Sequence, residues 1–171
     1  MKYLKPCLHI KSVEANGEVC GYASVFDEVD SYGDIVTHSA FKASIENFHK
    51  GKMPKLLWQH DVNCPIGIIE EIKEDQHGLF VKCRLLLEVQ KAKDVYCLIK
   101  NKAIDGFSIG YKLRDSYFEN GYHYLTDVDL LEISIVTFPA CESAVIEDVK
   151  SQNNILKNIN TINQLIKGYI K

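Results

Sequence analysis

The sequence lacks the short motifs that mark metal-binding and disulfide-stabilised proteins. Its six cysteines, at positions 7, 20, 64, 83, 97 and 141, include no Cys-x-x-Cys pair, which argues against a zinc site or a disulfide framework. Its six histidines include no His-x-x-x-His pair, so no helical metal site is predicted. We therefore expect neither a metal nor another cofactor, and we expect the cysteines to behave as small apolar residues.

Dense positive charge and long apolar runs are also missing. Among the 171 residues, 20 Lys and Arg stand against 23 Asp and Glu, which gives a net charge of −3. A nucleic-acid partner is not expected, because such a protein needs a basic face. No stretch approaches the ~20 apolar residues of a membrane-spanning helix, and the N-terminus has no signal-peptide core. We expect a soluble, cytosolic protein with no membrane partner.

What the sequence does contain is a succession of short strand patterns. They occupy residues 8–26 (broken by a turn at Asn16–Gly17), 55–61, 66–72, 78–87, 107–113, 117–125 and 128–138. Two further segments have helical spacing: one ends near residue 49, with Thr37 or Ser39 as its candidate cap, and the other covers 88–102. The pattern predicts a mostly β fold with two inserted helices (α+β), arranged as a closed or nearly closed antiparallel β-barrel.

The C-terminal part of the chain differs in composition from the rest. From about residue 151 it is rich in asparagine and has no strand signal. Apolar residues nevertheless recur there at steps of four and three, at Ile155, Ile159, Ile162, Ile166 and Tyr169. A terminal helix packed on the domain and a linker with a docking or assembly helix both fit this spacing. We predict a β-barrel domain at 1–150 and a helical tail at 151–171.

The sequence Gly-Phe-Ser-Ile-Gly-Tyr at 106–111 is the first candidate for chemistry. Ser108 stands between Gly106 and Gly110, which allow a substrate to approach the backbone closely. A small hydroxyl beside backbone N–H groups that can hold an oxyanion is what an acyl-transfer nucleophile needs. The alternative interpretation is a strand that ends in a tight bend.

A serine nucleophile needs a base, and the base needs an orienting group. His60, at the polar end of an apolar run, is our first candidate for the base; His123 competes with it, and His38 reads equally well as a helix-start residue. Glu132 interrupts an apolar strand, and if buried it needs a partner such as an imidazole. A solvent-facing Glu132 on an edge strand is the alternative, and Asp61 is then the other candidate orienting group.

Taken as a set, these segments resemble the prohead maturation proteases of tailed phages, a serine peptidase family related in fold to the herpesvirus assemblins. The resemblance covers residues 8–146 and follows four blocks in the family's order. The blocks are Gly-Tyr-Ala-Ser-Val-Phe (21–26) with Asp-Ile-Val (34–36) and Ala-Phe (40–41); Leu-Trp-Gln-His-Asp (57–61) with Pro-Ile-Gly (65–67); Gly-Phe-Ser-Ile-Gly-Tyr (106–111); and Leu-Glu-Ile-Ser-Ile-Val-Thr-Phe-Pro-Ala (131–140). The implied fold is a herpesvirus-protease-like antiparallel β-barrel.

The resemblance implies that His60 and Ser108 form the catalytic pair. Glu132 is our choice for the third member, although the assemblins use a second histidine near that spacing. The implied function is a serine endopeptidase that cleaves scaffold, or the scaffolding segment of the major capsid protein. It would act inside the phage prohead in the bacterial host cytoplasm, or be encoded by a prophage. The tail fits a docking or self-cleaved segment, and a homodimer or larger self-association is compatible with this family.

Two other functions compete with the protease. An esterase or lipase of the α/β-hydrolase type shares Gly-x-Ser-x-Gly, but it needs a strand–turn–helix around the serine and a histidine late in the chain. Here the residues after Ser108 read as strand, and His123 is the one histidine that follows. The stronger rival is a non-catalytic capsid-assembly module with the same barrel. A serine-directed phosphonate probe separates the two, because only a nucleophilic Ser108 reacts.

Overall fold

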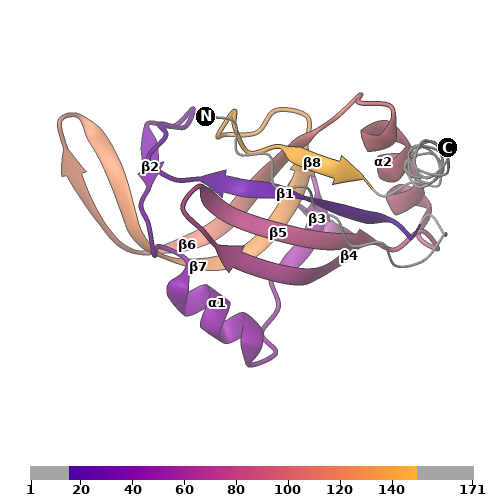
Figure 1. Cartoon of the computed structure of the whole chain (residues 1–171), viewed down its shortest axis with the longest axis horizontal. Helices are drawn as coiled ribbons and strands as arrows, with labels where there is room; N and C mark the ends of the chain where they lie inside the picture. Colours follow the sequence, from indigo (N-terminus) through magenta and orange to yellow (C-terminus); the bar gives the residue numbers. More distant parts are fainter. Residues whose placement is uncertain (1–15, 150–171) are drawn as a thin grey trace, which may run out of the picture.

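The structure, a computed structural model, describes residues 16–149, which form eight strands and two helices (Figure 1). A single sheet contains all eight strands: β1 (Glu18–Val25), β2 (Asp34–Val36), β3 (Lys55–Trp58), β4 (Asp61–Glu74), β5 (Gly78–Leu85), β6 (Gly106–Glu119), β7 (Tyr122–Val136) and β8 (Ile146–Val149). The helices are α1 (Lys42–His49) and α2 (Gln90–Lys100). No helix between residues 16 and 149 is long and apolar enough to cross a membrane.

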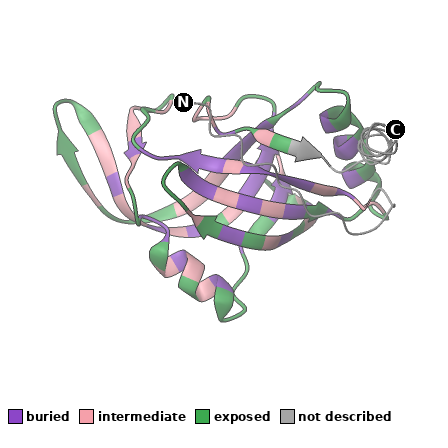
Figure 2. Ribbon diagram, viewed as in Figure 1, coloured by how far each residue is buried: buried purple, intermediate pink, exposed green. Residues whose placement is uncertain are grey.

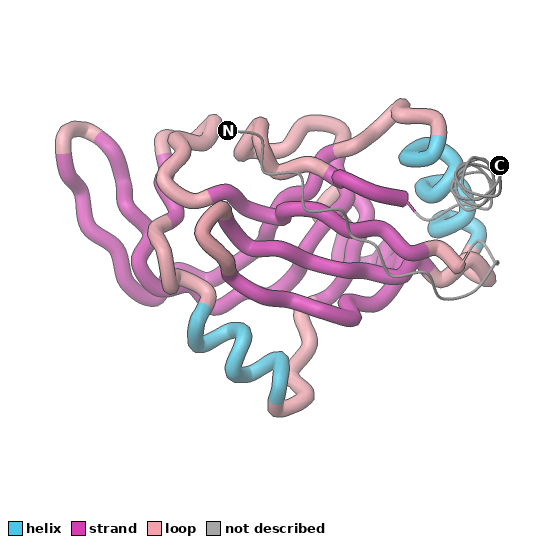
Figure 3. The backbone as a smooth tube through the Cα atoms, viewed as in Figure 1, coloured by secondary structure: helices cyan, strands magenta, loops and turns pink. Residues whose placement is uncertain are grey.

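The sheet is strongly curled, as the tube in Figure 3 shows. Its strands run β2-β7-β3-β4-β5-β1-β8, and β6 pairs with β7 away from this path. The segment before β8 lies between β1 and β6: Tyr22 N–H donates to the Val145 carbonyl at 3.2 Å, and Phe107 N–H donates to the Ala144 carbonyl at 2.7 Å. The predicted mostly β fold with two inserted helices is confirmed, in the form of a half-barrel.

The pairing of β7 differs from the prediction of a purely antiparallel sheet. Both β2 and β3 run parallel to it, with Asp34 opposite His123 and Leu57 opposite Ser134. A long connection separates each of them from β7 in the chain, so no hairpin dictates their direction. The predicted strands 107–113, 117–125 and 128–138 are in fact two long strands, β6 and β7. They meet at the predicted turn, where Asn120 and Gly121 have φ of 51° and 85°.

The core follows the alternation read from the sequence (Figure 2). On β5, the four residues predicted to share a face are each at most 1% exposed: Leu79, Val81, Cys83 and Leu85. On α2, the predicted apolar stripe is buried at Ala92, Val95, Tyr96 and Ile99. The five described cysteines form no disulfide with one another; Cys83 and Cys20 are buried, as expected for small apolar residues, whereas Cys97 is exposed. These faces make the wall that supports the strands of the candidate site.

The predicted first helix is present, but its cap differs from both candidates. The helix begins at Lys42, and no side chain of its own N-cap residue bonds to it. Instead, Glu74 at the end of β4 accepts the Phe41 N–H at 2.9 Å. The Thr37 hydroxyl donates to the Leu125 carbonyl, and Ser39 has a φ of 69°, so neither serves as the cap. The cap comes from a strand distant in sequence, which local pattern could not reveal.

Ser44 fastens α1 to β7. Its buried hydroxyl donates to the Val128 carbonyl at 2.8 Å and accepts the Leu130 N–H at 2.9 Å. Both backbone groups lie on the strand that carries the candidate site. The helix therefore holds one stretch of β7 in place through a single side chain.

The strand predicted before the Asn16–Gly17 turn and the helical tail predicted at 151–171 lie outside the described residues. The boundary at residue 150, and a docking or self-cleavage role for the tail, stay predictions.

Replacing Ser44 with alanine should lower the free energy of unfolding by about 1–3 kcal/mol, because a buried donor and a buried acceptor on β7 both lose their partner. Denaturant unfolding monitored by circular dichroism measures the change. The control is Ser116→Ala on β6, whose hydroxyl has no hydrogen-bond partner in the described part of the chain. Equal stability of the two variants would contradict the anchoring role of Ser44.

Candidate active site

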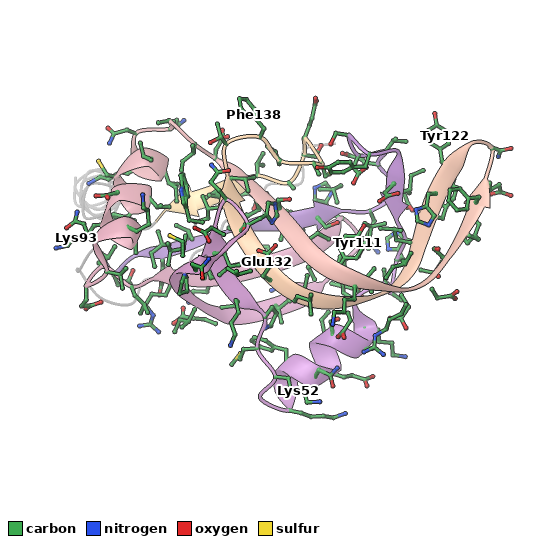
Figure 4. The ribbon with its side chains drawn as sticks, turned by 180° about the vertical axis from the view of Figure 1, so that it is seen from behind. Lys52, Lys93, Tyr111, Tyr122, Glu132 and Phe138 are labelled. Atoms are coloured by element: carbon green, nitrogen blue, oxygen red, sulfur yellow. The ribbon has the colours of Figure 1, made fainter. Side chains whose placement is uncertain are left out.

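Strand β7 lies between the two elements that carry the predicted nucleophile and base. On one edge β6 pairs antiparallel with it, so that Ser108 stands opposite Ser134 and Gly110 opposite Glu132. On the other edge β3 pairs in parallel over residues 132–135, and the turn that holds His60 follows β3. Figure 4 shows Glu132 near the middle of this face. Side chains two residues apart on β7 point to the same side.

Ser108 is 8% exposed and lines a cavity of about 350 Å³. His60 lines the same cavity, so two of the predicted residues border one space. Within the described residues, the Ser108 hydroxyl has no hydrogen-bond partner. Tyr111 and Phe138 also border the cavity, and both are labelled in Figure 4. The hydroxyl is thus available to a molecule that enters the cavity.

His60 occupies an unfavourable backbone conformation in the tight turn between β3 and β4. Gln59 and His60 have φ of 52° and 60°, a region that residues other than glycine rarely adopt. Three hydrogen bonds hold the turn to the end of β7: Gln59 N–H to the Ile135 carbonyl (3.1 Å), Gln59 Nε2 to Thr137 Oγ1 (2.7 Å) and His60 N–H to Ser134 Oγ (3.0 Å). Such strain is found where the surroundings fix a functional side chain.

Glu132 is the direct partner of His60. Its Oε1 lies 2.6 Å from His60 Nδ1, and its Oε2 accepts the Ser134 hydroxyl at 2.6 Å. The carboxylate side chain is 13% exposed and the imidazole 46%, so the contact lies at the boundary between core and solvent. An Nδ1–H that donates to the carboxylate leaves Nε2 free to accept a proton. The pairing expected for a buried Glu132 is present, and the solvent-facing alternative is wrong.

Gly110 makes room for this carboxylate. A Cβ atom at position 110 would lie 2.2 Å from Glu132 Oε1 and 2.9 Å from its Cδ, closer than real atoms approach. Gly110 is not among the glycines with positive φ, so space and not backbone conformation requires a glycine there. The second glycine of Gly-x-Ser-x-Gly therefore serves the base and its partner, and not the serine itself.

The other candidate bases and orienting groups do not border the Ser108 cavity. His123 does not line the cavity and pairs with Asp34 at 2.8 Å in the β6–β7 hairpin. Asp61 accepts the N–H of the residue two positions on, and His38 pairs with Asp27 at 3.2 Å on the surface. Of the candidate acids and bases, the structure brings His60 and Glu132 together. Within residues 16–149, no three His, Cys, Asp or Glu side chains are grouped to hold a metal ion.

Ser134 is the residue that sequence reasoning missed. It is fully buried, donates to the Glu132 carboxylate and accepts the His60 backbone N–H. It thereby fixes both members of the His60–Glu132 pair. A signal was present in the sequence, because Ser134 is a second polar residue two positions after Glu132 in an apolar strand, and the two side chains must share a face.

Comparison with known proteins identifies the family of this chain. The family model described as caudovirus prohead serine protease matches residues 7–159. The chain belongs to this family of serine peptidases. The earlier resemblance, drawn from four sequence blocks, is therefore confirmed.

Two relatives in this family are prohead proteases. That of Enterobacteria phage HK97 is 33% identical over 139 residues, which cover 79% of this chain and 61% of the relative. That of Escherichia phage T5 is 28% identical over 154 residues, which cover 85% of this chain and 71% of the relative. The chain thus spans less than two thirds of the length of the HK97 protein.

Two solved structures share the fold. The bacteriophage T4 capsid assembly protease gp21 superimposes with a TM-score of 0.54 at 13% identity, over 70% of this chain and 80% of that one. The KSHV protease, solved with a hexapeptide phosphonate inhibitor, gives a TM-score of 0.53 at 10% identity, over 84% and 76%. The likeness to a herpesvirus protease confirms the predicted fold class.

Replacing Gly110 with alanine should push the Glu132 carboxylate away from His60, because the added methyl group and Oε1 cannot occupy the same place. We expect a loss of about 1–3 kcal/mol in the free energy of unfolding, as for other overpacked sites. We also expect a shift of the His60 ring signals in ¹H–¹⁵N NMR spectra.

The control is Gly51→Ala, where nothing lies within 4 Å of the added methyl group but φ is +88°. That variant should lose about 1–2 kcal/mol through backbone strain and leave the His60 signals in place. Unmoved His60 signals in the Gly110 variant would disprove the packing role of Gly110.

Proposed function

We propose that this chain is a serine endopeptidase of prohead maturation, with Ser108 as the nucleophile, His60 as the general base and Glu132 as the group that orients the base. The observation that carries the proposal is the 2.6 Å contact between His60 Nδ1 and Glu132 at the cavity that Ser108 borders. In an acyl-transfer enzyme, a carboxylate on Nδ1 fixes the tautomer in which Nε2 can take a proton.

The reaction follows from these roles. Ser108 Oγ attacks the carbonyl carbon of a peptide bond while His60 Nε2 takes the hydroxyl proton. The resulting imidazolium is stabilised by Glu132 and returns the proton to the leaving amine as the C–N bond breaks. Water then attacks the acyl-enzyme, gives its proton to His60, and releases the new carboxyl end. Ser108 recovers its proton, so the chain returns to its starting state.

The proposed substrates are scaffold, or the scaffolding segment of the major capsid protein, within an immature phage capsid. Support comes from membership of the prohead protease family and from the names of the HK97 and T5 relatives. Action within the prohead, in a bacterial host cell, is part of the same proposal.

A fluorophosphonate probe incubated with the full chain should label Ser108, because the Ser108 hydroxyl is the proposed nucleophile. Peptide mapping by mass spectrometry identifies the labelled residue. Ser108→Ala should abolish the label, and His60→Ala should slow labelling by several orders of magnitude, because triad members act as a unit. Processing of proheads by the Ser108→Ala variant at the wild-type rate would refute the enzyme and favour the non-catalytic assembly module.

Replacing Glu132 with glutamine should reduce kcat by about 10²- to 10⁴-fold, because an amide does not enforce the productive tautomer of His60. The rate is measured on a protein substrate cleaved by the wild type. A Glu132→Gln variant that folds normally and keeps the wild-type kcat would show that Glu132 has no catalytic role.

Ser134→Ala tests positioning within the same hydrogen-bonded chain. The variant should lose about 1–3 kcal/mol of stability, and kcat should fall because the His60 turn and Glu132 lose a common anchor. Ser44→Ala is the matched control, because Ser44 is also a buried serine that donates to and accepts from groups on one strand. A similar loss of stability in both, with kcat reduced only by Ser134→Ala, is the expected result.

A further inference from the structure

The cavity beside Ser108 is lined by charge of one sign. Three carboxylates border it, from Glu28, Asp30 and Asp34, and none of the described residues that border it is a Lys or Arg. Two described histidines lie near these carboxylates: His60 borders the cavity, and His123 Nδ1 lies 2.8 Å from Asp34 Oδ1. A recess with acidic groups and low-dielectric walls attracts and retains cations.

Asp34, which borders the recess, is held in place by hydrogen bonds. It is the first residue of β2; its Oδ1 lies 2.8 Å from His123 Nδ1, and its Oδ2 accepts the Tyr111 hydroxyl at 3.3 Å. The Asp34 and His123 side chains are each 20% exposed. Asp30, in the loop before β2, accepts the backbone N–H groups of Tyr32 and Asp34 through Oδ1. The position of these charges is thus defined by the fold and not by mobile side chains.

The pKa of the Tyr111 phenol reflects its burial and the negative charge of this region. Burial, together with the nearby charge of Asp34, the hydrogen bond to it and the charge of Asp30, raises the pKa of Tyr111 to about 12. The phenol therefore keeps its proton at neutral pH and donates to Asp34. The phenol itself therefore does not cancel the charge of the carboxylates.

The rest of the wall suits the stem of a long side chain. Val36, Phe107 and Leu125 are among the apolar residues that border the same space. Lysine and arginine bury their methylene groups along apolar surface while the charged end reaches a polar partner. The volume of about 350 Å³ falls in the range of sites that enclose small ligands, so it admits such a side chain.

The buried hydroxyl of Ser108 is an independent feature that points to a ligand in this recess. Ser108 is 92% buried, given its 8% exposure, and its unpartnered hydroxyl borders the same space. In the proposed reaction, that hydroxyl attacks the carbonyl carbon of the residue on the acyl side of the scissile bond. The Cα atom that carries the side chain of that residue is bonded directly to the attacked carbon. It is therefore the substrate side chain best placed to enter the recess.

We propose that the recess bordered by Glu28, Asp30 and Asp34 accepts a lysine or arginine side chain on the acyl side of the cleaved bond. This inference rests on the proposed function of Ser108. A hydrogen bond between a cation and a carboxylate is stronger than a neutral one, so a basic residue should be preferred over an uncharged residue of equal length by about 10- to 100-fold.

The test uses the full chain and matched peptidyl diphenyl phosphonates that differ only in the residue on the acyl side: lysine, arginine, norleucine or glutamate. The rate constant for covalent labelling of Ser108 is followed by mass spectrometry. Lysine and arginine probes should react about 10- to 100-fold faster than norleucine, and glutamate slowest. Raised ionic strength should reduce this preference, because salt screens the attraction.

The matched variants remove the negative charge of a carboxylate and keep the size and shape of its side chain. In Glu28→Gln/Asp30→Asn, the asparagine keeps the acceptor for the loop N–H groups, and the ratio of lysine to norleucine rates should fall at least several-fold. Glu46→Gln, an exposed carboxylate on α1 that does not border the recess, should leave the ratio at its wild-type value.

Three results would overturn the proposal. Equal rates for lysine and norleucine probes, or an unchanged ratio in the double variant, would reject the basic preference and leave the protease intact. A failure of fluorophosphonate and every peptide probe to label Ser108 in the folded chain would instead refute the proposed function on which this inference rests.

Discussion

The pairing of β7 on both of its edges is the constraint on which the rest of the site depends. Strand β6 brings Ser108 to one edge, and β3 brings the His60 turn to the other. Glu132 and Ser134 project from the strand between them, so one stretch of backbone sets the distances among all four residues. A shift of one residue in this register would turn Glu132 to the opposite face of the sheet.

Structural features that depend on neighbouring residues in the sequence were predicted correctly. The alternating pattern of β5 and the apolar spacing of α2 gave the right faces, and Asn120–Gly121 gave the right turn. A buried carboxylate needs a hydrogen-bonded or charged partner, and an imidazole was one that would serve for a buried Glu132. The family resemblance then favoured His60 as a member of the site, and the geometry agrees with this pairing.

Features that depend on distant parts of the chain were not predicted. The parallel pairing of β3 with β7, the capping of α1 by Glu74 and the contact between β1 and the segment before β8 have no local signal. From sequence, Gly110 was expected to let a substrate approach the backbone beside Ser108. The residue that needs the space is instead Glu132, which lies opposite Gly110 on β7. Sequence spacing describes a single strand, whereas these contacts join strands brought together by the fold.

The left-handed turn at Gln59 and His60 also affects when the chain becomes competent during its synthesis. The hydrogen bonds that hold this turn come from residues 72 to 78 positions later in the sequence. A nascent chain that has emerged only as far as β5 has the β3–β4 pairing but lacks the hydrogen bonds from β7 that hold these two residues in a conformation they disfavour. The histidine thus cannot be set in its working position until the last long strand has been translated and has docked. Assembly of the sheet itself delays reactivity until β7 has emerged and paired.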